Sequence, residues 1–87
     1  MKNKVLVKVM MPEMDLTFDI FIPVNELVWK IKKLIIKCVS DITCYPLDIK
    51  EEYYLVNKSN GNFYNNNDVV INTDIRNSTE LILVSKV

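Results

Sequence analysis

Two neighbouring segments near the start of the chain alternate between two sets of side chains, and this pattern constrains the fold most strongly. Residues 4–10 place Val5, Val7 and Val9 on one face of an extended chain. Residues 16–22 repeat the pattern with larger apolar side chains: Leu16, Phe18, Ile20 and Ile22. A period of two residues is typical of a half-buried strand. Because Pro12 to Asp15 predicts a turn, we expect a β-hairpin in which outward Lys8 pairs with Asp19.

The following segment predicts one amphipathic helix over residues 25–39, with Asn25 as its N-cap. At about 100° per residue, six apolar residues form its core-facing stripe: Val24, Leu27, Ile31, Leu34, Ile35 and Cys38. The lysines cover most of the remaining surface: Lys30, Lys32, Lys33 and Lys37. Trp29 and Ile36 fall nearly opposite the stripe. Both are therefore expected on the exposed side of the helix.

The second half of the chain predicts short strands separated by turns. The Asn60-Gly61 pair is a strong signal for a type I′ hairpin turn. The Asn-rich run at 65–68 is expected to be a polar loop. The remaining expected elements are an irregular connection over 40–52 that contains Pro46, a strand at 53–56, a short strand at 63–64, a turn at 74–79 and a last strand at 80–85.

Length and charge restrict the class of protein. The chain has 87 residues, which fits one domain spanning 1–87. Its 49% hydrophobic content is sufficient for a folded core. Eleven basic residues balance eleven acidic ones, so the net positive field that attracts nucleic acid is missing. No nucleic-acid partner is expected.

The residue inventory argues against catalysis. The chain has no histidine, which is the commonest general base and metal ligand. Cys38 and Cys44 lack metal-site spacing and are expected to be buried free thiols. Four carboxylates lie close together in sequence, but no histidine, metal-ligand spacing or Gly-rich loop accompanies them: Asp41, Asp48, Glu51 and Glu52. We therefore expect no enzyme activity, no cofactor and no metal.

Targeting signals are also absent from the sequence pattern. The opening Met-Lys-Asn-Lys-Val leads into a charged alternating segment rather than into the apolar core of a signal peptide. The apolar runs are far shorter than the roughly 20 residues that span a bilayer. A cytoplasmic location without membrane insertion is expected.

The order of these elements resembles the ubiquitin-like β-grasp fold. This α+β fold has the order ββαββ(β), with one helix packed across a mixed sheet. Residues 71–84, INTDIRNSTELILV, resemble the closing segment of ubiquitin-like domains. The opening Val-x-Val hairpin, the Phe18-Asp19-Ile20-x-Ile22-Pro23 segment and the strand Tyr54-Leu55-Val56 are similar to YukD/EsaB-like proteins of bacterial type VII secretion loci.

The resemblance implies a non-enzymatic protein-interaction module that serves a type VII secretion system as an accessory or regulatory component. The WXG-type secretion machinery would supply its protein partners. Conjugated ubiquitin-like proteins end in Gly-Gly, whereas the sequence here ends Val84-Ser85-Lys86-Val87, so activation of the carboxylate is not expected. Two alternatives stay open: a sulfur-carrier or conjugation-type protein without that Gly-Gly, and a regulatory oligomerisation domain of a toxin or phage locus.

Two surfaces are candidate protein-binding sites. Four residues would form an apolar patch on the sheet face turned away from the helix: Tyr54, Val56, Ile82 and Val84. Leu6 and Phe21 would enlarge it. Trp29 and Ile36 form the second candidate, suited to a homodimer or a docked partner.

Each candidate surface has a simpler explanation. The sheet residues are also ordinary strand formers on a solvated face, and a register shift of one residue would exchange the two faces. Folding of the 40–52 connection over the helix would bury Trp29. The lysines also suit an ordinary solvated face, with contact to an acidic partner or an anionic membrane surface as the other reading.

Overall fold

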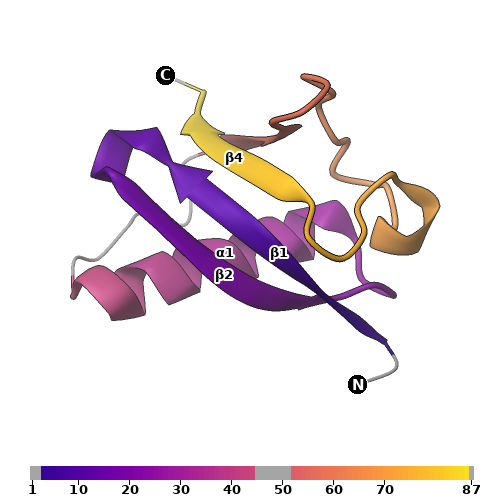
Figure 1. The fold of residues 1–87 in the computed structure, drawn as a ribbon, viewed down its shortest axis with the longest axis horizontal. Coiled ribbons are helices and arrows are strands. Elements are labelled where there is room, and N and C mark those ends of the chain that lie inside the picture. Colours follow the sequence, from indigo (N-terminus) through magenta and orange to yellow (C-terminus); the bar gives the residue numbers. More distant parts are fainter. Residues whose placement is uncertain (1–2, 45–51, 87) are drawn as a thin grey trace.

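The structure, a computed structural model, describes residues 3–44 and 52–86. It contains one α-helix packed on a sheet of four strands (Figure 1). The elements are β1 (Lys4–Met11), β2 (Leu16–Pro23), α1 (Val28–Thr43), β3 (Tyr53–Asn57) and β4 (Glu80–Ser85), with short 3-10 turns at Pro12–Met14 and Val70–Asn72.

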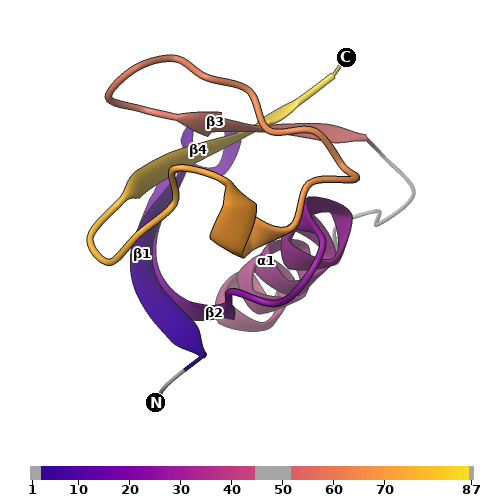
Figure 2. The same cartoon turned by 90° about the vertical axis from the view of Figure 1, so that its right-hand side faces the viewer.

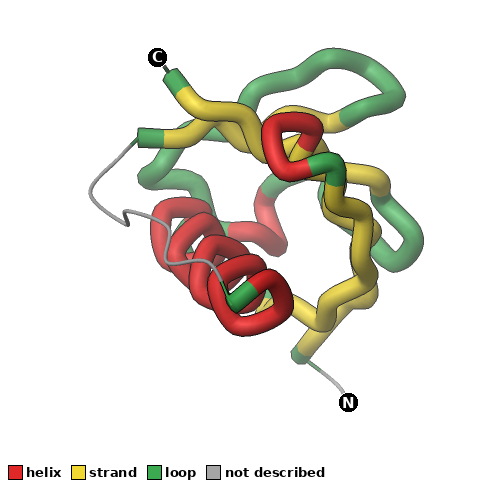
Figure 3. The backbone as a smooth tube through the Cα atoms, turned by 90° about the vertical axis from the view of Figure 1, so that its left-hand side faces the viewer, coloured by secondary structure: helices red, strands yellow, loops and turns green. Residues whose placement is uncertain are grey.

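The strands lie in the order β2-β1-β4-β3. The β1–β2 and β3–β4 pairs are antiparallel, whereas the central β1–β4 pair is parallel. Parallel strands need a crossover connection, and α1 lies in the connection between the two halves of this sheet. Figure 2, which looks along the layers, and Figure 3 both show α1 on one side of the sheet. The mixed β-grasp sheet that the sequence predicts is confirmed.

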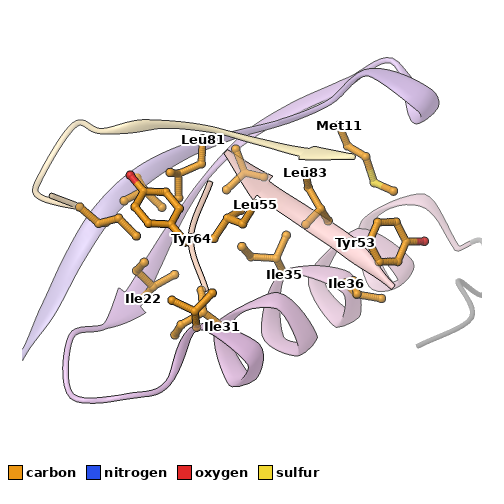
Figure 4. Close-up of a cluster of buried hydrophobic side chains, with 14 of the residues drawn as sticks. Met11, Ile22, Ile31, Ile35, Ile36, Tyr53, Leu55, Tyr64, Leu81 and Leu83 are labelled. Atoms are coloured by element: carbon orange, nitrogen blue, oxygen red, sulfur yellow. The ribbon is translucent and has the colours of Figure 1, made fainter. Parts of the chain in front are cut away.

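The core lies between α1 and the inner face of the sheet, as Figure 4 shows. Each strand contributes alternate residues, and the most buried are Val7, Val9, Ile22, Leu55, Leu81 and Leu83, all 0% exposed. Phe18 and Ile20 from the edge strand pack partly buried against this cluster. The inward residues of the hairpin and of the two later strands are therefore those that the alternation predicts. Lys8 and Asp19 are register partners, also as expected.

The helix begins and ends later than the sequence pattern predicts. It begins at Val28 rather than near Asn25, and no side chain caps it. Its first N–H groups instead donate to loop carbonyls: Val28 N to Asp68 O at 2.8 Å and Trp29 N to Asn66 O at 3.3 Å. A local cap is unnecessary because a distant segment satisfies these otherwise unpaired donors. The Asn-rich loop is thus the tertiary cap of α1.

The buried face of the helix is also rotated about the helix axis relative to the predicted stripe. The buried residues are Val28, Ile31, Ile35, Ile36 and Val39. The prediction that Ile36 is exposed is wrong, since only 3% of it is accessible. Figure 4 shows Ile36 at the same end of the core as Tyr53. Leu34 and Cys38 are only half-buried, because they lie beside the true stripe rather than in it.

The expected type I′ turn and the short strand expected at 63–64 do not form. Gly61 has a φ of +74°, but Asn60 is not among the residues with positive φ, which a type I′ turn requires. The chain makes a longer loop, in which Asn57 Oδ1 accepts from Ser59 N at 2.8 Å and Asn60 Oδ1 from Asn62 N at 2.9 Å. These side-chain turns compete with a tight hairpin. A single bridge between Val56 and Phe63 replaces the expected strand at 63–64.

Candidate functional site

The face of the sheet turned away from α1 carries most of the predicted binding residues. Tyr54 lies opposite Val84 and Val56 lies opposite Ile82 in the antiparallel β3–β4 pair. Tyr54 is 39% exposed, and the other three are half-buried. The register therefore brings these four residues together, on the outer face as expected.

Two further residues that the sequence reading missed extend this cluster. Met10 is the register partner of Ile82 across the parallel pair. Phe63 bridges to Val56 and is 61% exposed. Its ring meets the ring of Tyr54 edge-on, with centroids 5.1 Å apart. We define the apolar patch as six residues: Met10, Tyr54, Val56, Phe63, Ile82 and Val84. The alternation of β1 places Met10 on the same face as Lys8, so the sequence could have indicated Met10. The position of Phe63 depends on a loop that the sequence does not predict.

A basic side chain lies at the rim of the apolar patch. Lys86 Nζ lies 4.8 Å from the centre of the Tyr54 ring, within cation–π range. The same Nζ is 3.1 Å from Glu52 Oε2. Glu52 thereby positions the cation over the aromatic ring. The patch thus combines an aromatic pair with a charged rim, the composition that protein interfaces favour.

A row of four charged residues crosses the same face next to the apolar patch. Lys8 is the register partner of Asp19 on one side and of Glu80 on the other. Lys58 N donates to Glu80 O at 3.0 Å, and Lys58 Nζ is 3.3 Å from Glu80 Oε2. We call Asp19, Lys8, Glu80 and Lys58 the charged row. Its signs alternate across the sheet.

Leu6 and Phe21 lie on the far side of the charged row. They face each other in the β1–β2 register and are 38% and 50% exposed. A recess of about 320 Å³ lies at this boundary, lined by Leu6, Val7, Lys8, Asp19, Ser78 and Glu80. Leu6 and Phe21 share the outer face with the apolar patch, as predicted. They do not enlarge it continuously, because the charges intervene.

Trp29 and Ile36 do not form a joint surface. Ile36 belongs to the core, whereas Trp29 is half-buried. The Nζ atoms of Lys30 and Lys33 lie 5.5 and 4.9 Å from the Trp29 ring centre. In the alternative given above, the 40–52 connection buries Trp29, but residues 45–51 of that connection lie outside the described residues. Trp29 alone therefore remains from this second candidate surface.

Two lysines of the basic helix face have local partners. Lys30 pairs with Glu26, with an N–O distance of 3.5 Å. Lys32 Nζ donates to Asn66 Oδ1 at 2.7 Å, which ties the helix to its capping loop. Burial, with a smaller contribution from nearby Lys86, lowers the pKa of Lys32. These contacts give Lys30 and Lys32 local roles in the fold.

A hydrogen-bond network fixes the loop that carries Phe63. The hydroxyl of buried Tyr64 donates to the carboxylate of Asp74 and accepts from Asn57 Nδ2 at 3.1 Å. Asn60 Nδ2 donates to Asp74 Oδ2 at 2.9 Å. Burial, followed by the bond to Asp74, raises the pKa of Tyr64 to about 12. The bonds from Tyr64 and Asn60 lower the pKa of Asp74.

The described residues contain no group of three or more potential metal ligands. Of the carboxylates considered above, Asp41 and Glu52 are exposed, while Asp48 and Glu51 lie outside the described residues. Both cysteines are free. Burial raises the pKa of the half-buried Cys38 thiol. Cys44 is exposed, so the prediction that both are buried is wrong; it ends α1 with a left-handed φ of +54°, where the chain leaves the core.

The one helix, α1, has 16 residues, fewer than the roughly 20 that cross a bilayer core, and no longer helix occurs in the described part of the chain.

Comparison with known proteins matches no family model and no curated protein. A chain of the MycP5-free ESX-5 inner membrane complex, a type VII system, superposes with a TM-score of 0.78 at 16% identity. That match covers 95% of this chain but only 21% of the ESX-5 chain, so this chain spans about a fifth of its length.

Smaller proteins also superpose. The ubiquitin-like domain of an Arabidopsis thaliana protein gives a TM-score of 0.72 at 20% identity, covering 98% of this chain and 80% of that one. A chain from a structure concerning molecular mimicry of SUMO in DNA repair gives 0.70 at 18% identity, covering 94% and 91%. These similarities, together with the helix on its mixed sheet, show that the chain has the ubiquitin-like β-grasp fold.

Proposed function

We propose that this chain is a non-enzymatic protein-interaction module that recognises its partner through the apolar patch. The observation that carries the proposal is the exposed aromatic pair of Tyr54 and Phe63 on the face of the sheet turned away from α1. Neither ring is needed to fill the core, which lies on the opposite face. Exposed aromatic clusters with a charged rim are the usual energetic centres of protein interfaces.

The partner we propose is a cytoplasmic component of a type VII secretion machine. Two independent similarities support this: the resemblance of the hairpin and of Tyr54-Leu55-Val56 to YukD/EsaB-like proteins, and the superposition on a chain of the ESX-5 complex. In this role the domain acts as an accessory or regulatory subunit. Fold similarity alone carries no function, so the proposal depends on the apolar patch.

Affinity capture tests the proposal. The tagged chain is incubated with a lysate of a Gram-positive bacterium that carries a type VII locus, and bound proteins are identified by mass spectrometry. We expect a secretion component to bind the wild type. The double variant Tyr54→Ala/Ile82→Ala should recover it roughly tenfold less or worse, since truncating an interface centre costs about 2 kcal/mol or more.

Two matched variants locate the surface. Phe21→Ala removes an exposed aromatic ring from the same sheet but outside the apolar patch, and Trp29→Ala removes the second candidate surface. Both should retain the partner. Equal recovery of the secretion component by the wild type and all variants would overturn the proposal, as would loss with Trp29→Ala alone.

A further inference from the structure

The charges of the charged row alternate in sign across the four strands. Its members are Asp19 on β2, Lys8 on β1, Glu80 on β4 and Lys58, which directly follows β3. The signs are therefore negative, positive, negative, positive. When a second copy of this row is laid over the first in the opposite order, each charge faces a charge of opposite sign. All four side chains lie at or near the surface: three are exposed, and the Glu80 side chain is 42% accessible.

We propose that this outer face packs against the same face of a second copy of the chain. The two-fold axis would run parallel to the strands, between β1 and β4. This rotation reverses the strand order of the second copy. Lys8 then faces Glu80 of the second copy, and Asp19 faces Lys58 of the second copy. A symmetric dimer makes each of these contacts twice.

The charges also select this orientation over the alternative. A two-fold axis perpendicular to the strands would keep the strand order and place each charged residue over its own equivalent. Lys8 would then oppose Lys8 of the second copy, and Asp19 would oppose Asp19. Opposed like charges are destabilising. Only the axis parallel to the strands brings opposite charges together.

The next outward-facing row, which holds three residues of the apolar patch, fits the same arrangement. Thr17, Met10, Ile82 and Val56 follow one another across the sheet, two residues along each strand from the charged row. Reversal of the strand order places Met10 over Ile82 of the second copy and Thr17 over Val56 of the second copy. Apolar side chains thus meet apolar side chains or a threonine methyl, as in two aligned sheets that pack face to face.

This inference deepens the proposed function and rests on it for the role of the outer face. A second copy would cover the apolar patch that recognises the secretion component. Self-association and partner binding would therefore compete, and dissociation of the dimer would expose the binding surface.

Charge reversal tests the arrangement. Sedimentation or light scattering should show the wild type shifting from monomer to dimer as its concentration rises through the micromolar range. Lys8→Glu places two acids opposite each other in the dimer, and Glu80→Lys places two lysines opposite each other. Each variant alone should remain monomeric. An equimolar mixture should form a heterodimer, because each reversed charge then meets its opposite.

Two further proteins complete the experiment. In the double variant Lys8→Glu/Glu80→Lys, the acid at position 8 faces the lysine at position 80 of the second copy. This variant should therefore dimerise again. Lys33→Glu, on the exposed side of α1, should dimerise like the wild type. Circular dichroism of each variant separates loss of association from loss of folding.

Four results would overturn the inference: a wild type that stays monomeric, single variants that dimerise unchanged, a mixture that stays monomeric, or a double variant that does. None of these bears on the capture of a secretion component, which depends on Tyr54 and Ile82. Failure of that capture with successful charge exchange would instead leave self-association as the use of this face.

Discussion

The two faces of the same four strands obey different rules. The inner face is mainly apolar and its centre is fully buried, with Val7, Val9, Leu55, Leu81 and Leu83 at 0% exposure. On the outer face, alternate residues of the same strands form an apolar patch interrupted by a charged row. Burial against α1 explains the apolar inner residues. Burial against α1 does not explain the outer apolar residues. We therefore interpret them as a recognition surface rather than as part of the core.

The largest expected effect on stability is the difference between two adjacent residues of β4 that lie on opposite faces of the sheet. Leu83→Ala should lower the free energy of unfolding by about 2–5 kcal/mol, because it opens a cavity in the core. Ile82→Ala removes a similar side chain from the outer face and should cost about 1 kcal/mol or less. Urea denaturation of both variants measures the difference. Equal losses would show that the outer face also supports the fold.

A smaller effect is expected where a loop supports the apolar patch. Tyr64→Phe removes the hydroxyl that bridges Asn57 and Asp74 and should cost about 1–3 kcal/mol, since the Nδ2 group of buried Asn57 loses this acceptor. Tyr54→Phe, on the exposed aromatic, is the matched control and should change stability by a few tenths of a kcal/mol. A Tyr64→Phe variant as stable as this control would remove the network from the account.

The same network gives a pH dependence. The folded-state pKa of Tyr64 is raised to about 12, above the ordinary value near 10, so its stabilising contribution is complete below about pH 10 and is lost between pH 10 and 12. The pKa of Asp74 is lowered, so its contribution is present above about pH 4 and is lost as the pH falls further. Denaturation at several pH values should show the alkaline loss in the wild type. An equally steep loss in Tyr64→Phe would assign it to other groups.

The smallest effect is expected in the charged row. Lys58→Ala removes the ion pair with Glu80, whose two side chains are 51% and 42% exposed. Solvent-exposed pairs contribute only about 0–1 kcal/mol, and salt screens them. Thermal unfolding at low and high salt should therefore show a small loss that shrinks with salt. A loss as large as that of Leu83→Ala would mean that the charged row is part of what stabilises the fold.

The sequence predicts the inner face well and the site only in part. Local alternation decides which side of β1 or β4 is buried, so the hairpin and the last strand are predicted correctly. The start of α1 depends on Asn66 and Asp68, nearly forty residues away, which no local pattern reveals. The position of Phe63 depends on the loop after β3, and the charged row depends on which strands become neighbours. The position of Ile36 follows from the rotation of the helix on the sheet.

The most direct test of the outer face uses light-activated cross-linking at single positions. A photo-reactive phenylalanine analogue is introduced at the position of Tyr54 in one protein and of Lys33, on the exposed side of α1, in another. After incubation with the same bacterial lysate, adducts are identified by mass spectrometry. We predict a covalent adduct with a secretion component from position 54 and none from position 33. An adduct from position 33 alone would contradict the outer face as the recognition surface.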